Sequence, residues 1–508
     1  MIETAFQSWS VQKSAALLEL VTSGSRGWAQ YYADDGPAFV RIGNLDHDTI
    51  ALDLQDVQHV RPPKNAEGAR TKLQPGDILI SITAELGMVG LVPKGFGEAY
   101  INQHIALARP KPGVDARYLA WFFASEGKRQ LLDMRRGMTK AGLGLDDIRN
   151  VDVLVPPLNE QRRIVAKLEA LQSRSRRARE ALDAVPPLLE KLRQSILAAA
   201  FRGDLTKDWR AQNPNPEPAS ALLARIRTER RQKWEASELA KLKAKGKVPA
   251  NDSWKAKYKE PEPPDTTGLP ELPEAWCWAN AEEICHEVTV GHVGPMEHRY
   301  TTEGVPFLRS QNVRANRYDP AGLRFIPPAF HRELAKSRLT PGDLVIVRSG
   351  APGTACVVPD ELVDANCADL VIARLVSSVD PHLMAFYMNS AWATGAVLDA
   401  QVGVAQQHFN VGAMRTLHMP VVPPSEQEVL RVRLTKALAG VSTRGQALAE
   451  MIRSLSKLEQ GILAEAFRGE LVPQDPSDEP AAVLLARRHA EPRAESPRRG
   501  STRAKAAE

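Results

Sequence analysis

Two long stripes of apolar residues, one in each half of the chain, form its clearest pattern. Over residues 164–196 the mostly apolar positions recur at alternating steps of four and three, and residues 430–462 repeat this spacing with one interruption at Arg444. Alternating steps of four and three are the spacing of a coiled-coil seam. The pattern therefore predicts two long helices, over residues 159–203 and 426–470.

The sequence also marks where these helices end and where one is interrupted. Gly203 and Gly469 follow the two stripes, and glycine is the residue type favoured just after a last helical turn. Pro186 and Pro187 stand inside the first stripe, whereas the second has no matching prolines. Because proline lacks a backbone donor and clashes with the preceding turn, we expect a kink or break in the first helix.

Short β-type runs dominate the segments before each long helix. Residues 77–82 and 343–348 are largely apolar, rich in β-branched side chains and follow a Pro-Gly pair, which predicts strands. Residues 116–123 and 382–389 have the composition of short helices. Strands and helices mixed in this way predict an α+β globe of about 150 residues before each long helix.

The chain uses one module twice, with an offset of 266 residues. Residues 73–77 (Leu-Gln-Pro-Gly-Asp) recur at 339–343 (Leu-Thr-Pro-Gly-Asp). In the window 189–205, 12 of 17 positions are identical at that offset. Such a period is far longer than the roughly 20–50 residues of a solenoid repeat. The expected domains are two globes, over 1–158 and 271–425, each followed by its long helix.

The excess positive charge lies outside the globes. Residues 1–158 carry 17 Lys/Arg against 18 Asp/Glu, whereas residues 204–260 carry 14 against 8. We expect 204–270 to be a charged linker, helical over 219–247, and 471–508 to be a basic, disordered tail. Such a linker is usually a solvated segment, and the alternative is an electrostatic contact with DNA or an acidic partner.

Two seams of equal length in one chain are buried most simply against each other. Some 40 residues of helix at ~1.5 Å rise make a rod of about 60 Å, which is too long for one globe to cover. The alternative is that each stripe packs on its own globe. The long linker allows parallel and antiparallel pairing alike. The expected fold is α+β, with two pseudo-repeated globes joined by two long, paired helices.

Composition narrows the function classes. Apolar residues make up 43% and charged residues 25% of the chain, which is ordinary for a soluble protein. No apolar run approaches the about 18 residues of a membrane span, and the first ten residues lack the basic and apolar regions of a secretion signal. Four cysteines in 508 residues cannot form a disulfide framework. We therefore expect a cytoplasmic protein without membrane contact.

The motifs of several enzyme classes are missing from the sequence. No Pro-Pro pair belongs to the Asn/Asp-Pro-Pro-aromatic tetrapeptide of an amino-methyltransferase, and there is no GxxxxGK[S/T] phosphate loop. There is no CxxC pair for zinc. His286, His292 and His298 are spaced six apart, which is more typical of solvated or packed histidines than of a metal site. We expect no catalytic residue, no metal ligand and no cofactor in this chain.

Two similar globes on a stiff spacer suit an extended, periodic partner such as double-stranded DNA. A pseudo-two-fold protein reads half-sites roughly 34–36 Å apart. Because the globes differ in sequence, we expect a bipartite, asymmetric target with an unread centre. Several glycine-punctuated loops carry residue types that suit base edges and phosphates, although each such side chain can also be an exposed loop residue without a partner. The candidate DNA-binding residues are Arg26, Trp28, Arg41, Asn44, Arg135, Arg136, Thr139, Lys140, His292, Arg309, Gln311, Asn312, Gln406, Gln407 and His408.

The duplicated helix boundaries resemble those of the specificity subunits of type I restriction–modification systems. Glu-Gln follows a proline-containing start at 160–161 and at 426–427, and Ala-Phe-Arg-Gly-Asp/Glu-Leu ends the helices at 200–205 and 466–471. The resemblance covers nearly the whole chain, including the charged linker. It implies that the globes are target recognition domains and that the helices form an antiparallel coiled-coil spacer, an orientation that the residues alone leave open.

The resemblance also implies partners. Two modification (methyltransferase) subunits would dock on the spacer and restriction subunits would join the assembly, and S-adenosylmethionine, ATP and magnesium would be bound by those partners. The expected spacer and docking residues are Leu168, Leu182, Leu189, Leu192, Ile196, Phe201, Leu434, Leu448, Leu455, Leu458, Ile462 and Phe467.

The leading hypothesis is a non-catalytic reader of DNA sequence that scaffolds modification and restriction subunits. A self-contained DNA methyltransferase or nuclease with unrecognised motifs is the alternative. A purely structural coiled-coil adaptor without DNA contact is the third possibility.

Overall fold

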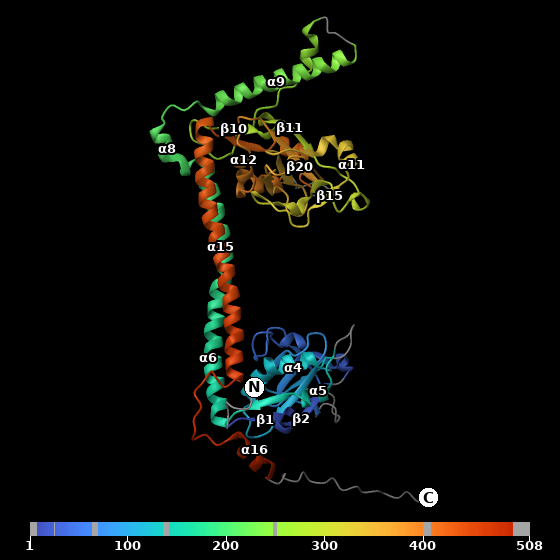
Figure 1. Ribbon diagram of the computed structural model, residues 1–508, viewed down its shortest axis with the longest axis vertical. Helices are drawn as coiled ribbons and strands as arrows, with labels where there is room; N and C mark the ends of the chain where they lie inside the picture. The colour runs from blue at the N-terminus through green and yellow to red at the C-terminus, as the bar shows by residue number, and fades with distance from the viewer. Residues whose placement is uncertain are drawn as a thin grey trace, which may run out of the picture. The chain divides into compact units, whose positions relative to one another are not determined.

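The chain folds into two compact units, shown in the computed structural model of Figure 1. One unit comprises Met1–Asp183 and Glu450–Glu508, and the other comprises Ala184–Ala449. Each unit therefore contains one globe together with parts of the long helices. The structure describes residues 8–24, 26–62, 70–135, 142–246, 251–399 and 408–490, without the side chains of 488–490.

The globe of the first unit holds two main sheets and several short helices. Its sheets have the strand orders β2-β8-β5-β6 and β4-β3-β7, and β1 pairs with β9. The strands are β1 (Ser10–Lys13), β2 (Leu18–Ser23), β3 (Tyr32–Val40), β4 (Gln58–Val60), β5 (Ile78–Ser81), β6 (Val89–Leu91), β7 (Ala99–Ile101), β8 (Ile105–Pro110) and β9 (Asp152–Val155). The helices are α1 (Ser14–Leu17), α3 (Ala116–Ala124), α4 (Glu126–Asp133), α5 (Leu145–Arg149), α6 (Leu158–Asp183) and α16 (Ala481–Ala490).

The second unit repeats this plan. Its sheets have the strand orders β11-β20-β17-β18 and β15-β12-β19-β16, and β10 pairs with β21 and β13 with β14. The strands are β10 (Cys277–Asn280), β11 (Cys285–Val290), β12 (Val305–Leu308), β13 (Val313–Arg314), β14 (Arg317–Tyr318), β15 (Arg324–Ile326), β16 (Arg338–Leu339), β17 (Leu344–Val347), β18 (Ala355–Val357), β19 (Ala365–Cys367), β20 (Leu370–Leu375) and β21 (His418–Val421). The helices are α7 (Val185–Phe201), α8 (Lys207–Gln212), α9 (Ala219–Ala244), α10 (Ala281–Ile284), α11 (Pro328–Glu333), α12 (Pro381–Met388), α13 (Ala391–Asp399) and α14 (Val411–Arg415), and α15 (Pro424–Phe467) contributes to both units.

The strands and short helices predicted from the sequence are present. β5 and β17 lie inside the two predicted strands, and α3 and α12 occupy the two predicted short helices. The repeat extends to irregular features, since both β2 and β11 carry a register shift near their starts. The parallel pairing of β3 with β7 recurs between β12 and β19.

The recurring Pro-Gly-Asp motif has a structural reason in both globes. The carboxylate of Asp77 accepts from the backbone N–H three residues earlier (2.7 Å) and pairs with Arg109 (2.6 Å). Asp343 accepts an equivalent backbone bond (3.0 Å) and lies 3.6 Å from Arg374. Each aspartate thus closes the turn before a central strand and ties it to the neighbouring strand.

In the first unit, the beginning of α6 and the end of α15 complete the core of the globe. Ile164 and Leu168 share one buried cluster with Ile462 and Phe467. Further along α6, Arg179 pairs with Glu459 (2.6 Å). Higher residue numbers on α6 therefore meet lower numbers on α15, so the two segments run in opposite directions within this unit.

In the second unit, the end of α7 and the beginning of α15 have the same relationship. Leu197 and Phe201 share the buried core of the second globe with Leu430 and Leu434. The ring of Phe201 packs edge-on against Tyr387, with the centroids 5.2 Å apart. Each globe is thus completed by the start of its own helix and the end of the other module's helix.

The predicted break and end signals of the helices are confirmed. α6 ends at Asp183 and α7 begins at Val185, so Pro186 and Pro187 occupy the first turn of a new helix, where proline is tolerated. Gly203 and Gly469 adopt positive φ angles of 81° and 72°, as a left-handed cap requires.

The predicted seam is buried unevenly. Leu168, Leu434, Leu448 and Ile462 are buried. The side chains of Leu182, Leu189, Ile196 and Leu455 are half-buried. Leu192 is 42% exposed and Leu458 is 58% exposed, so the stripe is not buried continuously. Exposure at seam positions arises where a helix rotates away from the ideal heptad register.

The expectations for the linker and the tail need correction. Linker residues Leu222, Leu223 and Ile226 are buried in the core of the second globe. In the part of the tail that the structure describes, Ala481 and Leu484 are buried, and α16 packs on the first globe. Both segments carry enough apolar surface to fold onto a globe, a property that their charge alone does not reveal.

No helix within the described ranges is long and apolar enough to cross a membrane. The four cysteines are free thiols, and three of them are buried. Among the described residues, no group of three or more His, Cys, Asp or Glu side chains has an arrangement suited to a metal ion.

Candidate nucleic-acid interface

In the first globe, the neighbouring strands β2, β8 and β5 bring three loops to one edge of their sheet. The N–H of Ile82, just after β5, donates to the carbonyl of His104, just before β8 (2.9 Å). The N–H of Gly24, just after β2, donates to the carbonyl of Ile105 (3.4 Å). Loop residues that are far apart in the sequence therefore meet at this edge.

The close approach of these loops requires glycine at the same place in both globes. A Cβ atom on Gly24 would lie 2.2 Å from the carbonyl oxygen of Asn102. A Cβ atom on Gly291, at the end of β11, would lie 2.8 Å from the sulfur of Cys367. Neither distance allows a side chain, so both glycines hold the loop against the next strand.

Polar side chains line a pocket at this edge of the first globe. We call Arg26, Thr83, Gln103 and His104 the first reader cluster, and all four line the same pocket. Thr83 Oγ1 lies 2.7 Å from His104 Nδ1, and Gln103 Nε2 lies 2.7 Å from His104 Nε2. The imidazole is therefore held between two fixed polar groups.

These two contacts determine which hydrogen-bonding groups of the cluster remain available to a ligand. Gln103 Nε2 can only donate, so His104 Nε2 accepts and its Nδ1–H donates to Thr83. The carboxamide oxygen of Gln103 then remains as an acceptor beside its second N–H. A carboxamide that presents both groups matches the paired donor and acceptor of an adenine edge.

The second globe has an equivalent edge with different chemistry. We call Arg348, Ser349, Asp369 and His408 the second reader cluster. Arg348 pairs with Asp369 (2.7 Å), and Ser349 Oγ lies 2.7 Å from His408 Nδ1. The ion pair partly neutralises and orients the guanidinium, a group that suits the two acceptors of a guanine edge.

The equivalence of the two clusters is visible in the backbone. Leu143 N–H donates to the carbonyl of Ile82 (3.0 Å), and Phe409 N–H donates to the carbonyl of Arg348 (3.1 Å). Both donor residues and both acceptor residues are 266 positions apart. The duplication therefore preserved the frame of the edge while its side chains diverged.

The structure brings Arg41 and Arg309 to the same edges. Both follow strands, β3 and β12, that run parallel to β7 and β19. Asn102 N–H donates to the carbonyl before Arg41 (3.4 Å), and Ala368 N–H donates to the carbonyl before Arg309 (3.0 Å). Each arginine therefore leaves its strand beside the segment that carries Gln103 or Asp369.

Three candidate DNA-binding residues are buried in the globes instead. The indole of Trp28 is 3% exposed and stacks on Phe39 with the ring centroids 5.1 Å apart. Asn44 and Asn312 are 3% and 0% exposed. The amide of each asparagine bonds a backbone N–H three residues earlier and two carbonyls further along. These side chains shape the loops, so their prediction as DNA readers is wrong.

The remaining candidate DNA-binding residues do not form a single cluster. His292 lies at the second edge, where its backbone bonds Cys367 and Asp369. Gln311 is exposed and donates to the carbonyl of Gly322 (3.1 Å). Arg135 is exposed at the end of the described segment after α4. Arg136, Thr139, Lys140, Gln406 and Gln407 lie outside the described residues.

Sequence reasoning missed Thr83, Gln103, His104, Arg348, Ser349 and Asp369. A signal for them exists, because Thr83 and Ser349 stand at the same offset of 266, as do Gln103 and Asp369. Thr83 and Ser349 directly follow the two predicted strands, whereas Gln103 and Asp369 lie just before β8 and β20. Combining the duplication with the strand ends would have found them.

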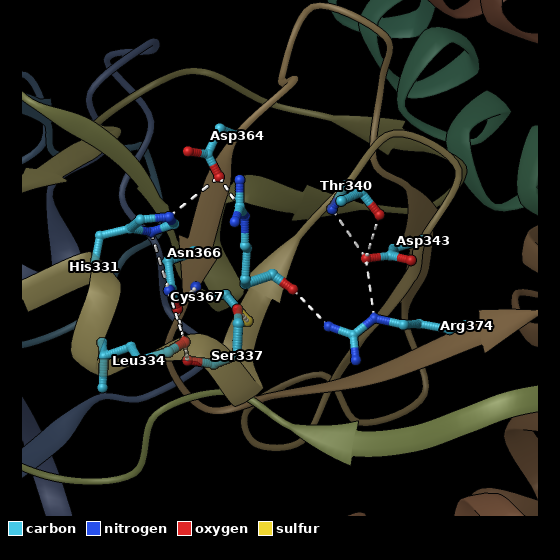
Figure 2. Close-up of polar contacts among 10 residues, drawn as sticks. His331, Leu334, Ser337, Thr340, Asp343, Asp364, Asn366, Cys367 and Arg374 are labelled. Atoms are coloured by element: carbon cyan, nitrogen blue, oxygen red, sulfur yellow. Dashed lines mark hydrogen bonds and ion pairs between the residues drawn. The ribbon is translucent and has the colours of Figure 1, made fainter. Parts of the chain in front are cut away.

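A buried polar network holds β19 in the second globe (Figure 2). Asn366 Oδ1 accepts from Ser337 Oγ (2.6 Å) and from the N–H of Cys367 (2.9 Å), and its amide donates to Leu334 (3.1 Å). His331 Nε2 lies 3.1 Å from Asp364. The network fixes β19, which leads directly to Asp369. Burial raises the pKa of the Cys367 thiol well above its ordinary value, so this cysteine remains protonated.

Comparisons with known proteins point to one family. Residues 67–182 match the family model described as the type I restriction modification DNA specificity domain. The chain is 24% identical over 490 residues to the type I restriction enzyme EcoKI specificity subunit of Escherichia coli (strain K12), which covers 93% of this chain and 90% of that protein. The solved HsdS subunit from Thermoanaerobacter tengcongensis has the same fold, with a TM-score of 0.53, 19% identity and coverage of 92% and 100%.

A second solved chain, described as "Structural basis underlying complex assembly and conformational transition of the type I R-M system", has a TM-score of 0.65. It is 18% identical, and the match covers 91% of this chain and 98% of that one. The fold is therefore shared along nearly the full length of both chains.

Proposed function

We propose that the chain is a specificity subunit of a type I restriction–modification system and that its two globes read a bipartite, asymmetric target in double-stranded DNA. It is the non-catalytic member that specifies the DNA sequence. The similarity to specificity subunits gives no support to the alternative, which is a self-contained DNA methyltransferase or nuclease.

One observation supports the proposal that the DNA target has two separate halves. Equivalent edges of the two globes hold the first and second reader clusters in the same backbone frame, but with different side chains. Identical frames place two readers in equivalent positions, and different side chains give them different preferences. The target therefore has two unlike halves.

We assign roles within each edge by chemistry. Gln103 is suited to an adenine, and Arg348 is suited to a guanine. Arg26, Arg41 and Arg309 lie beside these groups and are suited to phosphates, which position a protein on the duplex without specifying sequence. The first half-site is thus read mainly by a carboxamide and the second mainly by a guanidinium.

The long helices are proposed as an antiparallel spacer that fixes the separation of the half-sites. The opposite running directions within each unit support this arrangement, because the ends of α7 and α15 join the core of the other module's globe. A parallel pair would bring the two helix ends together. The unread centre of the target then corresponds to the DNA that the spacer bridges.

The spacer is also proposed to dock partner subunits. Leu192 and Leu458 are the exposed apolar side chains among the predicted docking residues, so both are accessible to a partner. We propose that two modification subunits bind here and that restriction subunits join them. S-adenosylmethionine, ATP and magnesium then belong to those partners.

Mapping the methylated bases in a strain with and without this gene tests the proposal. We expect one methylation motif with two specified halves and an unspecified gap, and we expect it to disappear with the gene. A single continuous motif would contradict the two-reader model. Methyl transfer by the isolated chain would contradict its non-catalytic role.

A further inference from the structure

The helix α9 has two parts with different surroundings. Its first turns are anchored in the second globe, where Leu222 and Ile226 are buried and Arg227 pairs with the buried Glu283 (2.6 Å). Arg230 donates to the carbonyls of Glu282 and Cys285. Beyond this residue every side chain of α9 is exposed or half-buried, and Figure 1 shows this part diverging from the strands of the globe.

Aromatic residues hold a second segment against the part of α9 that follows Arg230. Trp234 stacks with Trp254 of the short 3-10 helix Asp252–Lys257, with the centroids 6.1 Å apart and an interplanar angle of 21°. Tyr258 packs on the same indole (5.3 Å). We call the described residues of 231–260 the basic arm. The aromatic side chains of the arm pack against one another.

The outer surface of the basic arm is rich in lysine. Its described residues carry more Lys and Arg side chains than Asp and Glu side chains. Glu235 already pairs with Arg231 (3.2 Å) and Lys255 (3.5 Å). The excess positive charge therefore has no matching carboxylate on the arm.

The lysines gather in space. Lys241 bonds Glu238 (2.7 Å). This bond, and then the charges of Lys241, Lys257 and Lys245, lower the pKa of the Glu238 carboxyl. Lys241 of α9 and Lys257 of the 3-10 helix thus both act electrostatically on one carboxylate. Lys245 and Lys257 form no ion pair among the described residues, and the same holds for Lys243 nearby.

We propose that the basic arm binds DNA phosphates without reading sequence, outside the bases that the second globe contacts. This inference rests on the proposed function, which supplies the DNA. Its free helical part, about 14 residues at ~1.5 Å rise, spans about 21 Å, or about six base-pair steps of ~3.4 Å. Point charges on flexible stems suit phosphates, which need no fixed geometry.

An acidic protein surface is the competing partner. Cores of protein–protein interfaces are enriched in aromatic residues and depleted in lysine. The arm has the opposite distribution, because its aromatic residues face one another and its lysines face outward. The surface chemistry therefore favours a polyanion with regularly spaced charges.

The test is the salt dependence of DNA binding by the full chain assembled with its modification subunits. The variant K243Q/K245Q/K257Q/K259Q keeps side-chain length and good helix formers. The slope of log affinity against log salt falls by about 0.9 for each phosphate that the protein no longer neutralises, so we expect a reduction of about two to four. The ratio of affinities for target and scrambled duplexes should stay within about twofold.

Matched variants sharpen the test. K94Q/K336Q removes two exposed lysines that do not belong to the arm and should leave the slope unchanged, whereas E238Q/E260Q should strengthen binding at low salt. An unchanged slope in the fourfold variant, with normal binding by the wild type, would overturn the basic arm alone. Failure of this variant to co-purify with the modification subunits would overturn it in favour of an acidic protein partner. Absence of any target preference in the wild type would instead contradict the proposed function.

Discussion

The ring of Phe467 packs edge-on against Phe122, with the centroids 5.3 Å apart and an interplanar angle of 89°. Phe467 is the last residue of α15 and Phe122 belongs to α3 of the first globe. The end of the second module therefore completes the core of the first. Phe201 and Tyr387 repeat this contact in the other unit.

Replacing Phe467 by alanine should destabilise the first unit strongly. The side chain is 1% exposed, and deleting a buried phenyl ring costs about 3–5 kcal/mol. Thermal unfolding followed by calorimetry should show a lower midpoint for one transition. Leu458→Ala on the same helix should change stability by less than about 0.5 kcal/mol, because that side chain is 58% exposed. Equal destabilisation by both variants would mean that Phe467 does not belong to the core.

Two equivalent glutamates should respond in opposite ways to replacement by glutamine. Glu160 accepts from Trp9 (3.1 Å), and burial raises the pKa of its carboxyl above the ordinary value. A raised pKa means that folding disfavours the charged form, so the cost appears as the pH rises above the unfolded pKa and is complete above the folded pKa. Glu160→Gln should therefore stabilise the first unit at pH 7, and the gain should disappear once the pH falls below the ordinary glutamate pKa of about 4.3.

Glu426, at the matching position, provides the contrast. Its carboxylate is 0% exposed and accepts from Trp276 (2.9 Å) and from Arg210 (2.6 Å). Glu426→Gln would leave the guanidinium of Arg210 without its charge partner, which costs about 2–3 kcal/mol. Chemical denaturation of both variants at pH 7 and pH 4 checks the pair. A decrease in the stability of both variants at pH 7 would contradict the assignment for Glu160.

Changes in the two reader clusters should alter one half-site each. Gln103→Ala should reduce discrimination at one position of the first half-site by about 1–3 kcal/mol, and Arg348→Lys should do so in the second, since lysine lacks the planar fork. Methylation of a randomised target library by the assembled complex measures both. Gln55→Ala, an exposed residue of the first globe, is the control and should change neither half. Any variant that shifts both halves together argues against independent readers.

Exchanging the first globe should transfer its half-site. A chimaera that replaces residues 1–158 by another recognition domain should recognise a new first half and the old second half. The structure adds a condition, because the incoming globe must still pack on Phe467 and on α16. Sequencing of methylated DNA from cells with the chimaera gives the outcome. A second half that also changes would show that the globes do not act separately.

Sequence alone determined the features whose causes are local. The offset of 266 revealed the duplication, and Pro186 and Gly203 marked where the first long helix breaks and ends. Such signals work because proline and glycine act on their own backbone, whatever lies around them. The strand at β5 followed from its β-branched residues and the turn before it.

Only the tertiary structure decided which segments meet. The spacing of apolar residues predicted both helix seams. It could not assign Phe467 to the first globe, because the hydrophobic effect is non-directional and stabilises Phe467 against any apolar surface. Trp28 and Asn44 have the residue types of DNA readers, but the fold encloses them. Thr83 and His104 come into contact because strands distant in the sequence pair with each other. A local sequence pattern does not predict such a contact, since it depends on closing the loop between the strands and on packing elsewhere in the globe.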